Sequence, residues 1–232
     1  MRIESRLRKP LLSACAIASL TVGGAASAST ITAADFTDYV SAQNIGGVLF
    51  TADPGWFRKK TVAGFLGVGV AGTGNIVSGE IDDAETISAD FGGDVIVSEI
   101  TLGFLFLNGN EGDATDEIAR IIFGFGEQLE YGDLIVTGPS SATWTGPGGT
   151  VLSISPAVDG SGGVFQIRDP FGGRAVSALQ LAAVVDALVP LDNSNRDYAL
   201  VSISYSPVPE PGTALLAGLG LAGLAAAGRR RA

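Results

Sequence analysis

Residues 86–107 read TISADFGGDVIVSEITLGFLFL and carry the clearest strand pattern in the chain. Apolar and polar residues alternate from Thr86 to Phe91, which is the period of a half-buried strand. Gly92-Gly93-Asp94 predicts a turn. A longer strand is expected over Val95–Leu107, and its alternation slips near Ser98-Glu99, where we expect a β-bulge. The candidate inward residues of this strand are Val95, Val97, Ile100, Leu102, Phe104 and Phe106.

Short segments of the same kind recur on both sides of this stretch, separated by Gly, Pro, Asn and Asp. We expect strands over Gly47–Thr51, Ile118–Phe125, Leu134–Thr137, Thr150–Ser155, Gly163–Arg168, Ser177–Val185 and Tyr198–Tyr205. The apolar residues of 176–189 also suit a helix, but Pro190 closes the run and the neighbouring segments favour a strand. Many short strands with turn signals and little helix predict an all-β fold, an antiparallel β-sandwich of the jelly-roll type, over residues 29–206.

Residues 207–232 form a separate C-terminal segment with three parts. Val208, Pro209, Glu210 and Pro211 predict an extended, exposed linker, because proline fixes φ and removes a backbone donor. Residues 213–228 carry no charge and predict one transmembrane helix of about 24 Å, slightly shorter than the hydrocarbon layer. Arg229, Arg230 and Arg231 would keep the C-terminus on the cytoplasmic side. A buried Ala/Leu helix is the alternative, and it leaves this arginine cluster unexplained.

This order of parts resembles the PEP-CTERM sorting signal of bacterial exosortase substrates. The resemblance covers Val208 to Ala232 and includes the Pro-Glu-Pro motif, the short apolar helix and the arginine cluster. It implies export, a transient stay in the inner membrane and processing near Pro209-Glu210-Pro211 by exosortase. Products of this family are surface or extracellular-matrix proteins, often of organisms that make exopolysaccharide.

The N-terminus supports export independently. Arg2, Arg6, Arg8 and Lys9 form a basic region, and a mostly apolar stretch follows over residues 11–22. Ala26-Ser27-Ala28 is an A-x-A site, so residues 1–28 read as a signal peptide that signal peptidase removes between Ala28 and Ser29. The alternative is a lipoprotein box ending at Cys15, but its apolar region would be only five residues long, Pro10 to Ala14.

Composition limits what the exported part does. It contains no histidine, and the single cysteine of the chain lies in the signal peptide, so disulfides, thiol catalysis and His-ligated zinc are excluded. Residues 29–211 hold seven Lys/Arg against 23 Asp/Glu, a formal charge of −16. Such a surface repels nucleic acid and anionic lipid and attracts divalent cations.

Acidic loops are the first candidate sites. Glu80, Asp82, Asp83 and Glu85 lie close enough in sequence to share a calcium ion through two or three oxygens. A second set comprises Asn108, Asn110, Glu111, Asp113, Asp116 and Glu117, which does not fit the EF-hand loop because Ala119 stands at the twelfth position. The alternative for both is a solvated loop at the rim of the sandwich.

Aromatic residues are the second candidates. Trp56 and Trp144 would suit stacking on a sugar ring, whereas the alternative is packing in the core or at the rim. Arg58-Lys59-Lys60 would contact an acidic polysaccharide or pair with the acidic loops; a solvated strand end is the alternative. No pair of carboxylates stands in the apolar setting that a glycosidase needs, so we expect no enzyme activity.

A second resemblance concerns the domain itself. Gly67-Val68-Gly69-Val70, Gly79-Glu80-Ile81-Asp82 and Asp197-Tyr198-Ala199-Leu200 are similar to motifs of an ectodomain that recurs in PEP-CTERM proteins, and this implies a fold without an activity. We therefore expect a non-enzymatic surface or matrix protein. The alternatives are a carbohydrate-binding module, with calcium as a candidate cofactor, and a glycan-active enzyme.

Overall fold

The computed structural model describes residues 27–72, 79–82, 84–107, 116–125, 128–158, 162–184, 197–208, 218–220 and 223. The described domain is all-β. Its strands are β1 (Ser29–Thr32), β2 (Ala42–Ile45), β3 (Val48–Asp53), β4 (Trp56–Val62), β5 (Phe65–Ala71), β6 (Thr86–Leu105), β7 (Ile118–Phe125), β8 (Gln128–Gly138), β9 (Ser141–Trp144), β10 (Thr150–Ser155), β11 (Gly163–Arg168), β12 (Val176–Ala183) and β13 (Ala199–Pro207). A single 3₁₀ turn, η1 (Ala33–Asp35), interrupts them within this part of the chain.

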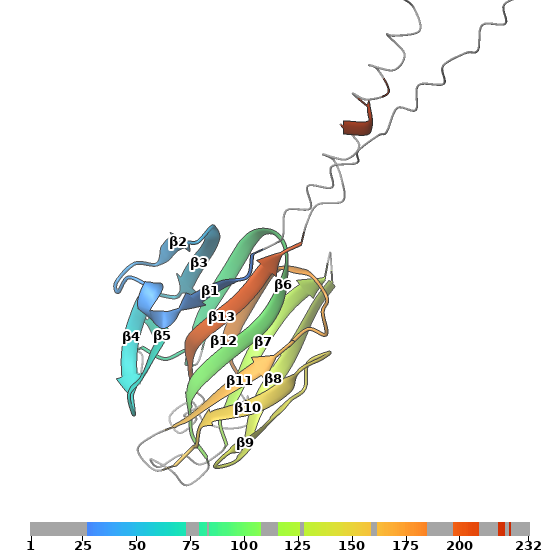
Figure 1. Ribbon diagram of the computed structural model, residues 1–232. Coiled ribbons are helices and arrows are strands. Elements are labelled where there is room, and N and C mark those ends of the chain that lie inside the picture. The colour runs from blue at the N-terminus through green and yellow to red at the C-terminus, as the bar shows by residue number, and fades with distance from the viewer. Residues whose placement is uncertain are drawn as a thin grey trace, which may run out of the picture.

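Strand β6 organises the sheet. Its first part, residues 86–90, pairs with β3 and β12, and its second part, residues 95–105, pairs with β13 and β11. All of these pairings are antiparallel. One ladder continues from β12 through β7 and β8 to β9, and the other from β13 to β5 and β4. The result is a continuous antiparallel sheet with sandwich-like layers; the jelly-roll type remains a prediction (Figure 1).

The residues predicted to face inward on β6 do so. Val95, Val97, Ile100, Leu102 and Phe104 are all buried, and Phe106 just beyond the strand is half-buried. The predicted bulge is confirmed too: Ser204 pairs with Glu99 but Tyr205 pairs with Val97, which leaves Ser98 as the extra residue. Alternation therefore identifies one buried face of this stretch and the point where it changes phase. It misses that residues 100–105 are buried on both faces, with Thr101 and Leu105 also in the interior.

Several predicted boundaries are wrong. Residues 86–91 and 95–107 are not two separate strands but parts of one, β6, which ends at Leu105. Residues 91–94 have no partner in the described ladders, and the register of β12 shifts across them, between Asp90 and Val95. Likewise β8 runs through Tyr131-Gly132-Asp133, which the sequence pattern indicates as a break. Strand β9 lies within the Gly/Pro-rich segment 138–149, over which we expected no strand. In β8 and β9 the turn-forming residues lie inside hairpin pairings, β7 with β8 and β8 with β9, which override their local preference.

The glycine-rich segment after residue 61 also forms a strand, β5. A Cβ on Gly69 would clash with the backbone of Glu80, and one on Gly67 would lie 2.6 Å from the Cβ of Ala199. These glycines allow the residue 79–82 segment and β13 to approach β5 closely. They are packing positions.

Both ends of the domain lie at the same end of the fold. Ser29 at the start of β1 pairs with Tyr205, and Pro207 at the end of β13 pairs with Val95, next to the corner of β6 (Figure 1). Among the residues that the structure describes, no helical stretch reaches the length and hydropathy needed to cross a membrane. The predicted span 213–228 lies outside the described residues except for 218–220 and 223, so it stays a prediction.

Candidate functional site

A buried acidic cluster lies where β5 meets the start of β13. Glu80 forms a bridge with Val70, and Ile81 forms one with Tyr198, so Asp197 lies beside the Glu80 segment. Glu80 and Asp197 are 2 % and 6 % exposed. Lys60 Nζ of β4 lies 3.0 Å from Glu80 Oε2, whereas none of the described N–H or O–H groups donates to the buried Glu80 Oε1.

The electrostatics of this cluster favour a proton on Glu80. Burial, followed by the neighbouring Asp197 carboxylate, raises the pKa of Glu80 to about 8, while Lys60 acts in the opposite direction. The two buried carboxyls of Glu80 and Asp197 therefore lie together with a single ammonium group, that of the partly buried Lys60. Sequence analysis named Asp197 only within a motif and not as a site residue, because more than a hundred residues separate it from Glu80 and nothing local marks their pairing.

The predicted calcium set is only partly described. Asp82 and Glu85 are buried rather than solvated, and Asp83 lies outside the described residues. Glu85 accepts hydrogen bonds from the backbone N–H groups of Gly72 at 3.2 Å and Asp82 at 3.3 Å. In the described part of the chain, no three acidic side chains form a group suited to a metal ion. The calcium site thus stays a prediction.

The second acidic set is described only at its end. Asp116 is exposed, whereas Glu117 is fully buried and accepts a hydrogen bond from the backbone N–H of Phe106. The other members of the set lie outside the described residues. Glu117 thus bonds to the backbone of the segment that follows β6.

Trp56 opens the exposed face of edge strand β4. It is 45 % exposed and shares this face with Arg58, since alternate residues of a strand point to one side, while Phe57 between them is fully buried. The Arg58 guanidinium lies 4.8 Å from the centre of the Tyr39 ring and 3.3 Å from Asp38 Oδ2. Trp56 also pairs with Ala71, which precedes the Gly72 that bonds to Glu85. The backbone of Trp56 is therefore linked to the acidic segment through one neighbouring strand, β5.

Tyr39 holds an unusual backbone conformation on this face. Its φ is +65°, a region that glycine normally occupies. Its N–H donates to Phe57 O at 2.9 Å, and Phe57 N–H donates to Val40 O at 2.9 Å, so two residues oppose one as in a β-bulge. The ring is 64 % exposed. Sequence analysis did not single out Tyr39, which only this bulge brings to Arg58.

Trp144 is engaged in packing. Its indole N–H donates to Pro170 O at 3.0 Å, and the ring covers Gly132 and Gly146, where any Cβ would clash with it. This environment matches the packing alternative for Trp144. The case for a sugar-stacking residue rests on Trp56.

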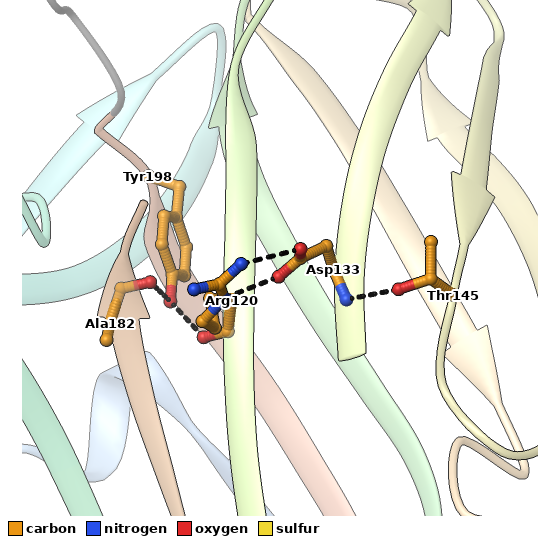
Figure 2. A network of polar contacts seen from close by, with 5 residues as sticks. All are labelled: Arg120, Asp133, Thr145, Ala182 and Tyr198. Carbon is orange, nitrogen blue, oxygen red and sulfur yellow. Dashed lines mark hydrogen bonds and ion pairs between the residues drawn. The ribbon is translucent and has the colours of Figure 1, made fainter. Parts of the chain in front are cut away.

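A polar network ties β13 to β7, β8 and β12 (Figure 2). The Tyr198 hydroxyl, on a fully buried ring, lies 3.0 Å from both Arg120 O and Ala182 O, and these two carbonyls share its single hydrogen. Burial raises the pKa of Tyr198 well above its usual range. Arg120 in turn donates to both carboxylate oxygens of Asp133, at 2.8 and 2.9 Å. All these groups satisfy one another, which is the arrangement of a structural network.

The end of the domain that carries both termini has its own geometry. Val208 N–H donates to Asp94 O at 2.9 Å, and Tyr205 donates through its hydroxyl to Gly46 O at 3.3 Å. A hollow of about 290 Å³ lies here, lined by residues that include Ser29, Gly47, Gly93 and Val208. Backbone bonding thus holds the chain in place as far as Val208.

Some of the predicted processing residues belong to the described part of the chain and others do not. Ala28, Ser29 and Val208 are described, with Ser29 exposed and paired to Tyr205. The remaining members of the two processing sites and the arginine cluster lie outside the described residues: Ala26, Pro209, Glu210, Pro211, Arg229, Arg230 and Arg231.

Comparison with protein families identifies the C-terminal segment. Residues 207–231 match the model of the PEP-CTERM protein-sorting motif. The chain carries a PEP-CTERM sorting signal. No curated protein and no solved structure matches the chain.

The PEP-CTERM signal implies an exported protein that exosortase processes and that reaches the cell surface. The match begins at Pro207, the last residue of β13. Signal and domain therefore adjoin directly: the final strand of the fold ends where the sorting motif begins.

Proposed function

We propose that the protein is a non-enzymatic component of the cell surface or extracellular matrix, associated with exopolysaccharide or biofilm. Signal peptidase would release residues 29 onward, and the helix at 213–228 would hold the chain in the inner membrane until exosortase acts. The observation that carries this proposal is the PEP-CTERM signal at the end of the last strand of a folded all-β domain.

Neither of the two described hollows brings two carboxyl groups together. A glycosidase needs two carboxyl groups flanking one bond. The hollow beside Val208 is lined by one carboxylate, Asp94, and a groove of about 490 Å³ across β3, β6, β7 and β12 is lined by one, Asp90. The buried pair Glu80 and Asp197 lines neither of them.

The second candidate function is carbohydrate binding, and the exposed face of β4 favours it. Trp56 and Tyr39 present two exposed aromatic rings, and Arg58 and Asp38 beside them offer a donor and an acceptor for sugar hydroxyls. Aromatic faces with a few polar groups are suited to pyranose rings.

One fractionation experiment tests both functions. Cells that produce the protein are separated into inner membrane, matrix and medium, and each fraction is probed for the wild type and for Trp56→Ala. We expect the wild type in the matrix fraction. If it stays in the inner membrane of cells that contain exosortase, the matrix proposal is wrong.

The carbohydrate proposal has its own outcome in this experiment. Trp56→Ala should shift from the matrix to the medium, because it loses a stacking surface. A matched control, Tyr131→Ala, removes another exposed aromatic ring, on β8, and should not shift. Retention of Trp56→Ala in the matrix at the wild-type level would exclude Trp56 as the glycan contact.

A further inference from the structure

The sorting signal begins without a spacer from the folded domain. Pro207 still pairs with Val95, and Val208 is hydrogen-bonded to Asp94. A chain spans at most about 3.5 Å per residue, so Pro209-Glu210-Pro211 lies within about 10 Å of Val208 whatever its conformation. Any enzyme that acts on this motif must therefore come into close contact with this end of the domain.

This end carries two exposed pairs of glycines. The turns at Gly46-Gly47 and Gly92-Gly93 are exposed, and all four glycines line the hollow beside Val208 together with Ser29 and Asp94. Such a surface lets a second protein approach the chain closely.

Gly93 is the informative position, because the fold does not require glycine there. Gly46, Gly47 and Gly92 have φ values of +60°, +93° and +69°, which glycine adopts readily. Gly93 has no such φ, and a Cβ built on it meets no atom within 4 Å. Folding alone would accept a side chain at this position.

We infer that the glycine surface around Val208, formed by Gly46-Gly47 and Gly92-Gly93, is the docking surface for exosortase. The inference rests on the proposed processing of the sorting signal and adds the part of the domain that the enzyme contacts. Absence of a side chain at Gly93 keeps the approach to residues 209–211 open. Bulk added there obstructs processing without disturbing the fold.

The test compares processing rates by intact mass after a pulse of synthesis in cells with exosortase. Gly93→Trp should be processed several-fold more slowly than the wild type, and Gly93→Ala at the wild-type rate. Thr61→Trp is the matched control: it adds the same side chain at an exposed position of the β4–β5 hairpin and should be processed normally. Thermal unfolding of each purified domain verifies that it folds.

A second variant separates steric obstruction from other causes. Six Gly/Ser residues inserted between Val208 and Pro209 span up to about 20 Å and should restore the rate of Gly93→Trp. A folded Gly93→Trp that is processed at the wild-type rate overturns the inference, and so does a slow variant that the insertion fails to rescue. A wild type that keeps its full mass with and without exosortase would instead contradict the proposed function itself.

Discussion

Glu80 is the residue whose environment departs most from its ordinary chemistry. Its carboxyl is buried against Asp197, and the one ammonium group of this cluster, Lys60, compensates a single negative charge. The pKa of Glu80 is raised from 4.5 to about 8, so the folded protein keeps a proton that the unfolded chain releases. The contribution of Glu80 to the free energy of unfolding is therefore fully present below the pKa of the unfolded state. It is lost as pH rises from about 4.5 through about 8.

Replacing this residue tests the assignment. Glu80→Gln keeps the size of the side chain and removes the titration, so the variant should be more stable than the wild type by on the order of 2 kcal/mol at neutral pH. At pH 4 both folded and unfolded glutamates hold their protons, and the difference should vanish. Urea unfolding at several pH values measures this difference in the free energy of unfolding between the variant and the wild type. A difference that does not grow with pH would contradict the raised pKa of Glu80.

At the scale of elements, strand β8 carries two bidentate ion pairs in different environments. Asp133 binds Arg120 through two oxygens, and Glu130 binds Arg174 in the same way, at 3.0 and 3.3 Å. The side chain of Asp133 is 16 % exposed, and its residue pairs directly with Arg120 in the β7–β8 ladder. The side chains of Glu130 and Arg174 are 38 % and 44 % exposed. We expect the more buried pair to contribute more to the free energy of unfolding.

Alanine at each carboxylate measures that difference. Asp133→Ala leaves the Arg120 guanidinium partly buried without its acceptor and should lower the free energy of unfolding by about 1–3 kcal/mol. Glu130→Ala is the matched control and should cost ~0.5 kcal/mol or less, because water replaces the lost partner. Equal costs in urea unfolding would show that the Arg120–Asp133 pair does not stabilise the β7–β8 pairing.

Sequence patterns predicted the strands correctly where the local alternation of apolar and polar residues itself determines which side chains are buried. Alternation over Val95–Phe104 predicted five buried residues of β6, and the slip near Ser98 predicted its bulge; the burial of both faces over residues 100–105 left no such pattern. The ends of elements were not predictable in this way: residues 91–94 look like a turn and have no partner in these ladders, yet β12 pairs on both sides of them, with Asp90 and with Val95, so that one strand results. Strand β5 was hidden because its glycines serve the close approach of Glu80 and Ala199.

At the scale of the molecule, the destination was predictable and the partners of the acidic residues were not. The PEP-CTERM signal is contiguous, so its parts could be recognised from sequence order. Glu80 and Asp197 come together only through the fold, as do Tyr39 and Arg58. The shared position of Ser29 and Val208 likewise depends on pairing between β1 and β13, which brings the first and last strands to one end.

The most direct test of the whole account is the intact mass of the native protein from cells with and without exosortase. With the enzyme, the account predicts a product that begins at Ser29 and ends near Pro209-Glu210-Pro211. Without it, the product should begin at Ser29 and still carry Arg229-Arg230-Arg231. A protein that retains the three arginines in both strains would contradict the account, because the C-terminal segment would then be a permanent anchor rather than a sorting signal.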